Sequence, residues 1–81
     1  MDFDHLRYFQ TLAACGSYTA AAKQLFISQP ALSYAISQLE ARTEIKLFER
    51  TARGVRLTPA GEEYLKHVDR AIEGPDIGKA R

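Results

Sequence analysis

Apolar side chains recur at intervals of three and four residues in four separate stretches of the chain, which is the spacing of amphipathic helices. The first helix is expected to run from the first residues to Gly16, where a glycine can end it. Asp2 or Asp4 is available to cap its start. Its buried face would be formed by five residues: Phe3, Leu6, Phe9, Leu12 and Ala13.

A short second helix is expected to begin at Ser17-Tyr18-Thr19, where a hydroxyl can accept a hydrogen bond from a free backbone amide. It would continue through the three alanines at 20–22 to Leu25. Alanine combines high helix propensity with little bulk, so another helix can cross this one closely. The pattern therefore favours a tight corner between two helices.

Ser28 and Pro30 mark the start of a third helix, because serine caps a helix well and proline is tolerated in the first turn. Helical spacing places the apolar residues on one face, which comprises Leu32, Ala35, Ile36 and Leu39. The opposite face has no acid before Glu40 and consists of Gln29, Pro30, Ser33, Tyr34 and Ser37. A merely solvated face usually carries Lys and Glu, so these uncharged hydrogen-bonding groups indicate a helix that reads a partner. From the polar face alone, solvated surface is an equally good interpretation of Gln29 and Ser33.

After Thr43 the pattern changes to a short alternation typical of a β-hairpin, in which 47–50 and 55–57 flank 51–54. Gly54 can supply the positive φ that a tight turn requires. A ribbon this small must lean on the helices, and the residues available for this are Phe48, Val55 and Leu57. Its basic residues are Arg50, Arg53 and Arg56.

Thr58 and Pro59 begin a fourth helix, with Glu62 and Glu63 at the positive end of its dipole. Its apolar stripe consists of Gly61, Leu65, Val68 and Ile72. Such a stripe has little of its own small domain left to cover, so we expect it to pair with a second copy of the chain. The expected organisation is a domain over 1–57, a linker and dimerisation helix over 58–73 and a disordered tail over 74–81.

Composition adds limits to this outline. With 81 residues, 46% hydrophobic and 26% charged, the chain is typical of one small globular domain. No apolar run approaches the roughly 20 residues of a membrane helix, and two acids stand where a signal peptide would carry positive charge. A single cysteine, Cys15, allows no intrachain disulfide and leaves a zinc site short of ligands. We therefore expect a cytoplasmic protein without metal, cofactor or membrane partner.

The net charge of +1 hides a local surplus of cations. Residues 42–56 hold five basic and two acidic side chains, a net charge of +3, while the rest of the chain sums to −2. Three helices, a basic hairpin and a further helix follow the order of a winged helix-turn-helix, a mainly α fold. In that fold one helix about 10–12 Å across enters the major groove of DNA, and the wing lays cations along the phosphates.

The residues also resemble a known family. The segments 27–33 (Ile-Ser-Gln-Pro-Ala-Leu-Ser), 47–50 (Leu-Phe-Glu-Arg) and 57–61 (Leu-Thr-Pro-Ala-Gly) closely resemble the N-terminal DNA-binding domain of LysR-type bacterial transcriptional regulators. The resemblance spans about residues 3–72 and implies a recognition helix at roughly 28–42, a wing at 47–57 and a linker helix that pairs in a dimer.

The same resemblance implies base contacts from Gln29, Pro30 and Ser33, and contacts from Arg50 and Arg53 to the DNA backbone or minor groove. The predicted DNA surface further includes Ser28, Tyr34, Ser37, Arg56, and Thr19 and Ala20 at the start of the second helix. The expected function is sequence-specific binding of double-stranded DNA by a dimer, on an inverted-repeat operator, to regulate transcription.

Two departures from the family pattern matter. Tyr34 stands where members often carry arginine, so one contact is lost or a phenol makes a different one. Members also continue into a large effector-binding domain, so the chain is expected to be either a fragment or a stand-alone domain. No small-molecule response is placed in these residues.

Other functions fit less well. An enzyme would need a nucleophile, paired acids or a phosphate loop around a pocket, and His5 and His67 stand isolated. A better rival is a winged helix that binds another protein. Binding to DNA should weaken by roughly 0.9 log units per phosphate contact per decade of salt, whereas docking on a protein should not.

Overall fold

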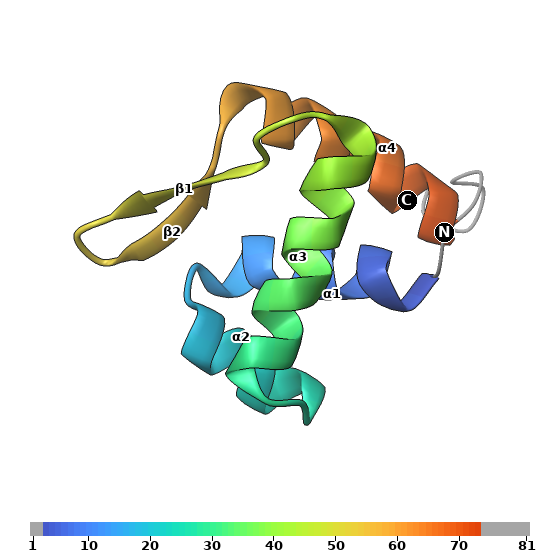
Figure 1. Ribbon diagram of the computed structural model, residues 1–81. Coiled ribbons are helices and arrows are strands. Elements are labelled where there is room, and N and C mark those ends of the chain that lie inside the picture. The colour runs from blue at the N-terminus through green and yellow to red at the C-terminus, as the bar shows by residue number, and fades with distance from the viewer. Residues whose placement is uncertain (1–2, 74–81) are drawn as a thin grey trace, which may run out of the picture.

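The computed structural model describes residues 3–73, which form four helices and one two-stranded antiparallel sheet (Figure 1). In chain order these elements are α1 (Phe3–Cys15), α2 (Tyr18–Leu25), α3 (Gln29–Thr43), β1 (Phe48–Thr51), β2 (Gly54–Leu57) and α4 (Pro59–Glu73). The predicted winged helix-turn-helix is therefore confirmed. The expected cap at Asp2 and the expected disordered tail at 74–81 lie outside the described residues. Within residues 3–73, no helix combines the length and the apolar character needed to cross a membrane.

Hydroxyl caps set the starts of three helices, as the sequence predicts. The Ser17 hydroxyl accepts from the amide of Ala20 at 3.2 Å, and the Ser28 hydroxyl accepts from the amide three residues ahead at 3.1 Å. At α4 the Thr58 hydroxyl accepts from the amide of Gly61 at 2.9 Å. Each cap satisfies an amide that has no partner within its own helix.

The end of α2 has a feature that the sequence analysis missed. Phe26 adopts a left-handed conformation (φ 60°) and donates from its amide to the carbonyl of Lys23, while Ile27 donates to that of Ala22. This is a Schellman cap, in which glycine is usual because a side chain strains the left-handed backbone. The ring of Phe26 is 93% exposed and contributes almost no packing.

Replacing Phe26 by asparagine is expected to raise the unfolding free energy by up to about 1 kcal/mol, because asparagine tolerates the left-handed region better than phenylalanine does. Nothing buried is lost with a ring that is 93% exposed. Urea unfolding followed by circular dichroism measures the change. A destabilised Phe26→Asn variant would show that the exposed ring supports the fold in some other way.

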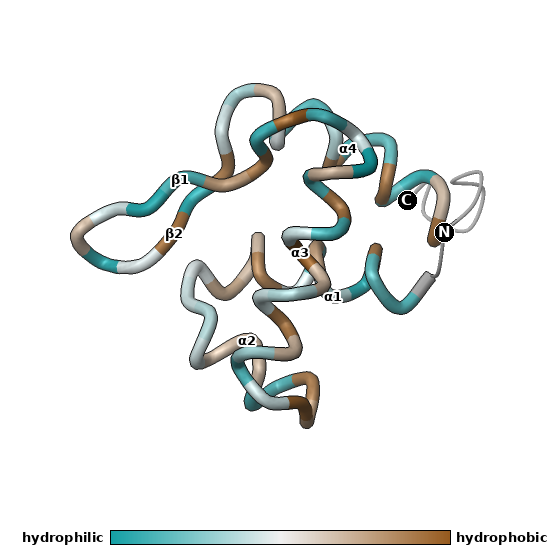
Figure 2. Tube along the Cα trace, in the orientation of Figure 1, coloured by the Kyte–Doolittle hydropathy of each residue, from teal (hydrophilic) through white to brown (hydrophobic). Residues whose placement is uncertain are grey.

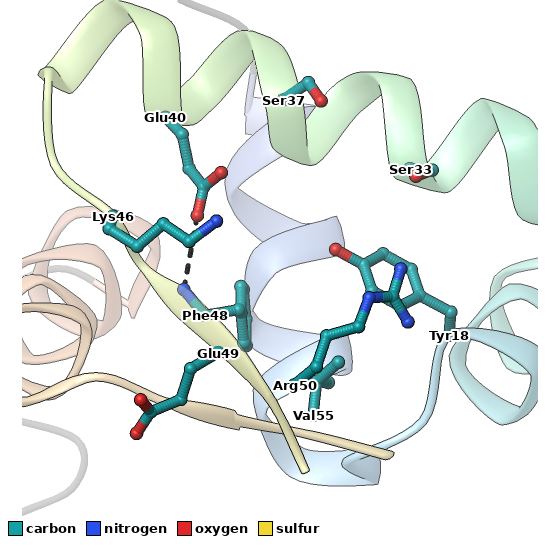
Figure 3. A pocket seen from close by; sticks show the side chains of 9 residues that line it. All are labelled: Tyr18, Ser33, Ser37, Glu40, Lys46, Phe48, Glu49, Arg50 and Val55. Carbon is teal, nitrogen blue, oxygen red and sulfur yellow. Dashed lines mark hydrogen bonds between the residues drawn. The ribbon is translucent and has the colours of Figure 1, made fainter.

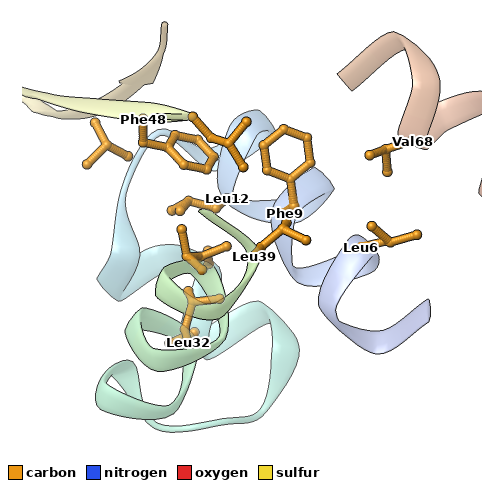
Figure 4. Packing of buried hydrophobic residues seen from close by; sticks show 12 residues of the cluster. Leu6, Phe9, Leu12, Leu32, Leu39, Phe48 and Val68 are labelled. Carbon is orange, nitrogen blue, oxygen red and sulfur yellow. The ribbon is translucent and has the colours of Figure 1, made fainter. Parts of the chain in front are cut away.

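The core lies where the four helices and the root of the hairpin meet (Figure 4). Phe9 of α1 is fully buried at its centre. Its ring makes edge contacts with Phe48 of β1, at a centroid distance of 5.4 Å, and with Tyr64 of α4, at 5.3 Å. One side chain therefore joins α1, the wing and α4.

The hairpin projects away from the helices beside α3 (Figure 1). Hydrophobic and hydrophilic residues alternate along β2, so Val55 is buried and Arg56 exposed (Figure 2). The register pairs Arg50 with Val55 and Glu49 with Arg56 across the two strands. Because paired residues point to the same side of a sheet, Arg50 lies on the face turned toward the helices.

Gly54 has the predicted positive φ, at 146°, but the reason for glycine differs from the predicted one. The turn itself is made by 52–53, and Gly54 is the first residue of β2. A Cβ at this position would overlap the carbonyl oxygen of Gly16. That same oxygen accepts a hydrogen bond from the amide of Val55 at 3.0 Å. Glycine here allows the returning strand to dock on the corner between α1 and α2.

The apolar stripe of α4 is covered differently from the prediction. Val68 is 2% exposed and belongs to the core. Gly61 is buried so close to the carbonyl oxygen of Leu47 that a Cβ on this residue would overlap it. Leu65 and Ile72 are half-buried against the same core. The premise that this stripe lacks cover within its own domain is therefore wrong. The protomer buries Gly61 and Val68, which cannot serve as contacts to a second copy in this conformation.

Candidate nucleic-acid interface

The two faces of α3 separate in the structure as the sequence predicts. Leu32, Ala35, Ile36 and Leu39 are buried. On the opposite face Gln29, Pro30 and Ser37 are exposed, Tyr34 is 65% exposed and Ser33 is half-buried. The exposed groups are an amide, hydroxyls and a phenol, so this face offers hydrogen bonds without a charge of its own.

The start of α3 adds a positive helix end to this face. Ser28 is exposed, and the hydroxyl that accepts from the helix amide still has its proton to donate. The start of α2, with Thr19 and Ala20, is also exposed. Amides and hydroxyls at helix starts are groups that commonly contact DNA phosphates.

The hairpin carries its three arginines to different places. Arg53 is exposed in the turn at the tip, and Arg50 lies on the face that is turned toward the helices. Arg56 points to the other face, where its Nε lies 3.0 Å from the carboxylate of Glu49. Both side chains of this ion pair are largely exposed, at 70% and 43%, and the predicted DNA contact of Arg56 stays a prediction.

A pocket of about 190 Å³ lies between α3 and the hairpin (Figure 3). Ser33 and Ser37 border it from α3, so it adjoins the exposed polar face of that helix. Lys46 and Arg50 border it from the hairpin side, and Tyr18 borders it from the start of α2. Neutral donors from one element and cations from another therefore meet in one hollow.

Glu40 also lines this pocket, but its carboxylate is engaged by backbone amides. One oxygen accepts from the amide of Leu47 at 2.8 Å and from the amide of Phe48 at 3.2 Å. These bonds tie the last turns of α3 to the start of β1 and thereby fix the wing beside the helix. From the sequence Glu40 is only the first acid on the polar face of α3, and its bonds to the hairpin were not predicted, because the spacing of helix residues says nothing about the strand that follows.

Tyr18 is the second residue that the sequence analysis missed. The guanidinium carbon of Arg50 lies 5.4 Å from the centroid of its ring (Figure 3). Burial raises the pKa of the Tyr18 phenol above its ordinary value of 10.0, the charge of Glu40 raises it further, and Arg50 acts in the opposite direction. The phenol is therefore protonated and neutral at physiological pH.

Other chemistry is sparse in the part of the chain that the structure describes. It contains no group of three or more His, Cys, Asp and Glu side chains placed to hold a metal ion. Cys15 is half-buried, and its thiol donates to the side-chain oxygen of Gln24 at 3.3 Å. The cysteine thus has a local structural contact at the corner between α1 and α2.

Comparison with known proteins identifies the family. Residues 3–62 match the family described as "Bacterial regulatory helix-turn-helix protein, lysR family". The transcriptional regulator TfdS of Cupriavidus pinatubonensis is 48% identical over 73 residues, which cover 90% of this chain and 25% of TfdS. ClcR of Pseudomonas putida is 43% identical over 81 residues, which cover 100% of this chain and 28% of ClcR. The chain thus spans about a quarter of the length of these relatives.

Solved structures agree with this assignment. The crystal structure of a CbnR_DBD-DNA complex matches with a TM-score of 0.85 and 41% identity, over 90% of this chain and 84% of that one. A BenM_DBD complex with catB site 1 DNA matches with a TM-score of 0.84 and 38% identity, over 90% and 78% of the two chains. The chain therefore belongs to the LysR family of bacterial helix-turn-helix regulators, and its residues 3–62 are the helix-turn-helix region of that family.

Proposed function

We propose that α3 enters the major groove of duplex DNA while the hairpin holds the sugar-phosphate backbone beside it. The observation that carries this proposal is the uncharged hydrogen-bonding face of α3, flanked by Arg50 and Arg53 of the wing. A groove about 12 Å wide admits one helix, and neutral amides and hydroxyls suit base edges. Arginine suits phosphates, because its planar fork can form paired hydrogen bonds.

Within this arrangement Gln29 reads bases, with Pro30 and Ser33 beside it, and Ser28, Thr19 and Ala20 lie toward the phosphates from the helix starts. Tyr34 and Ser37 extend the same face along α3. Arg53 holds the backbone or the minor groove from the tip of the wing. Arg56 is expected to contribute less, because it pairs with Glu49 on the other side of the hairpin.

We further propose that the domain acts as a homodimer and regulates transcription in the cytoplasm of a bacterium. The relatives it resembles are transcriptional regulators, and CbnR and BenM domains have been crystallised with DNA. With Gly61 and Val68 buried, Leu65 and Ile72 are the members of the predicted stripe that retain surface for pairing. Two symmetric copies would read an inverted repeat, with recognition helices about 34–36 Å apart or a multiple of that distance.

Two substitutions separate reading from holding. Gln29→Ala should relax specificity by about 1–3 kcal/mol at one base pair, because a paired contact to adenine is lost. Arg53→Ala should weaken binding to every sequence about equally and reduce the slope of log affinity against log salt by about 1. The measurement is site selection from random duplexes, followed by titrations at several salt concentrations.

Arg56→Ala is the matched control, because it removes an arginine from the same hairpin on the face paired with Glu49. Its effect on affinity and salt slope should be small. An affinity that does not depend on salt would favour the rival function, docking on another protein. Selected sites without inverted symmetry would argue against the dimer.

A further inference from the structure

Within the described residues, one contact not yet given a role joins Tyr18 to Arg50. The guanidinium carbon lies 5.4 Å from the ring centroid, a distance typical of a cation stacked over an aromatic face. The two residues belong to different elements, α2 and β1, and meet at the edge of the pocket between α3 and the hairpin. The contact therefore bears directly on where one cation of the wing is held.

The ring of Tyr18 has a defined position from which it can hold Arg50. It is the first residue of α2, directly after the capping serine, and its ring packs against the hydrophobic core. The ring is half-buried, so one side is held by the protein while the other remains available. A short helix start and a core contact thus give the ring a defined position.

Arg50 reaches the ring because of the strand register. Its cross-strand partner is the buried Val55, which places both side chains on the inner face of the hairpin. Arg50 is itself exposed, so the stacking leaves much of its side chain accessible. The N–H groups at the edges of a stacked guanidinium stay free to bind an anion.

Glu40 and Glu49, the two acids that line the pocket together with Arg50, are already engaged by other groups. Glu40 accepts from the two amides at the start of β1, and Glu49 pairs with Arg56 on the outer face. Among residues 4–72, whose side chains the structure describes, Arg50 has no ion pair with a carboxylate. The guanidinium group is therefore held against the ring of Tyr18, while its positive charge is not neutralised and can attract a phosphate.

We infer that Tyr18 is a positioning residue for DNA binding: its ring holds the Arg50 guanidinium at the mouth of the pocket between α3 and the hairpin, where a backbone phosphate binds. This inference rests on the proposed function. An arginine carries much rotamer freedom, and binding a phosphate would otherwise have to immobilise it. Stacking already restricts the Arg50 side chain in the free protein, so less conformational entropy is lost when the phosphate binds.

The test uses the 81-residue chain and a fluorescently labelled duplex of random sequence, since phosphate contacts do not depend on sequence. Tyr18→Leu removes the ring but keeps an apolar side chain, and we expect it to weaken binding about two- to five-fold. Tyr18→Phe is the matched control, which keeps the ring and should bind like the unmodified chain. In an Arg50→Ala background, Tyr18→Leu should cause no further loss.

Three results would overturn the inference. Tyr18→Leu could leave affinity unchanged, Tyr18→Phe could be as weak as Tyr18→Leu, or the two losses at positions 18 and 50 could be additive. The proposed function fails separately, if the unmodified chain shows no salt-dependent binding. If Arg53→Ala still lowers affinity and the salt slope while Tyr18→Leu does nothing, only the inference is lost.

A measurement on the unmodified chain keeps the test independent of how Tyr18→Leu folds. In NMR spectra, the side-chain protons of Arg50 should be shifted by the ring current of Tyr18, and those of Arg53, exposed on the same hairpin, should not. Equal and unshifted signals for the two arginines would show that no stacked arrangement exists in solution.

Discussion

Phe9→Ala is expected to lower the unfolding free energy by about 3–5 kcal/mol, the range found when a fully buried phenylalanine is truncated. Phe9 is 0% exposed, and its ring contacts Phe48 at 5.4 Å and Tyr64 at 5.3 Å. The substitution leaves a cavity where α1, the hairpin and α4 meet. A domain of this size has only roughly 4–12 kcal/mol of stability in total, so the loss removes a large fraction of it and should lower the melting temperature by many degrees. Urea unfolding followed by far-ultraviolet circular dichroism measures the loss.

Phe26→Ala is the matched control, because it deletes the same atoms from a ring that is 93% exposed. It keeps a side chain at the left-handed position, so the backbone strain is unchanged. The expected change is within about 0.5 kcal/mol. Similar losses for the two variants would mean that Phe9 is not the centre of the core.

Gly54→Ala is expected to destabilise the domain by about 2–4 kcal/mol and to weaken DNA binding. The residue has a φ of 146°, and a Cβ would overlap the carbonyl oxygen of Gly16, a backbone atom that cannot turn aside. The hairpin must then move away from the corner between α1 and α2 and lose the bond from Val55 to Gly16. Moving the hairpin also displaces Arg50 and Arg53. Thermal unfolding and duplex titration report the two effects.

Gly16→Ala separates strain from overlap. Gly16 also has a positive φ, at 71°, but a Cβ there would meet only the carbonyl oxygen of Val55, at an ordinary 3.6 Å. Gly16→Ala is expected to lower the unfolding free energy only by the cost of placing alanine in a left-handed conformation, about 1–2 kcal/mol. If Gly54→Ala were no more destabilising than Gly16→Ala, the close approach of the hairpin to this corner would not constrain the fold.

Local rules were sufficient for most of the fold. The caps at Ser17, Ser28 and Thr58 were predictable, because each is a hydroxyl that directly precedes a helical pattern, and at Ser28 and Thr58 a proline in the first turn marks the start as well. The polar face of α3 followed from the helical period alone. The pairing of Glu49 with Arg56 across the strands follows from the predicted hairpin, in which 47–50 and 55–57 flank 51–54, but their ion pair was not predicted.

What could not be predicted depends on contacts between distant segments. The stripe on α4 correctly indicated an apolar face that needs cover, but periodicity does not say whether that cover is the core or a second copy. The same limit applies to Tyr18, whose partner Arg50 lies on another element. Gly54 was assigned to a turn because glycine can supply a positive φ. Its close approach to Gly16 could not be predicted, because Gly16 is remote in the sequence.

Two backbone hydrogen bonds outside its own ladder hold the hairpin, one at its base and one further along β2. At its base the amide of Thr58 donates to the carbonyl of Leu47 at 3.0 Å, and further out the amide of Val55 donates to Gly16 at the same distance. Beyond these points only the turn at 52–53 and its immediate neighbours stand free. Adding residues to a loop costs little, about 0.6 kcal/mol for each doubling of its length. Insertions at this turn would therefore lengthen the reach of the domain along a duplex and leave its root unaltered.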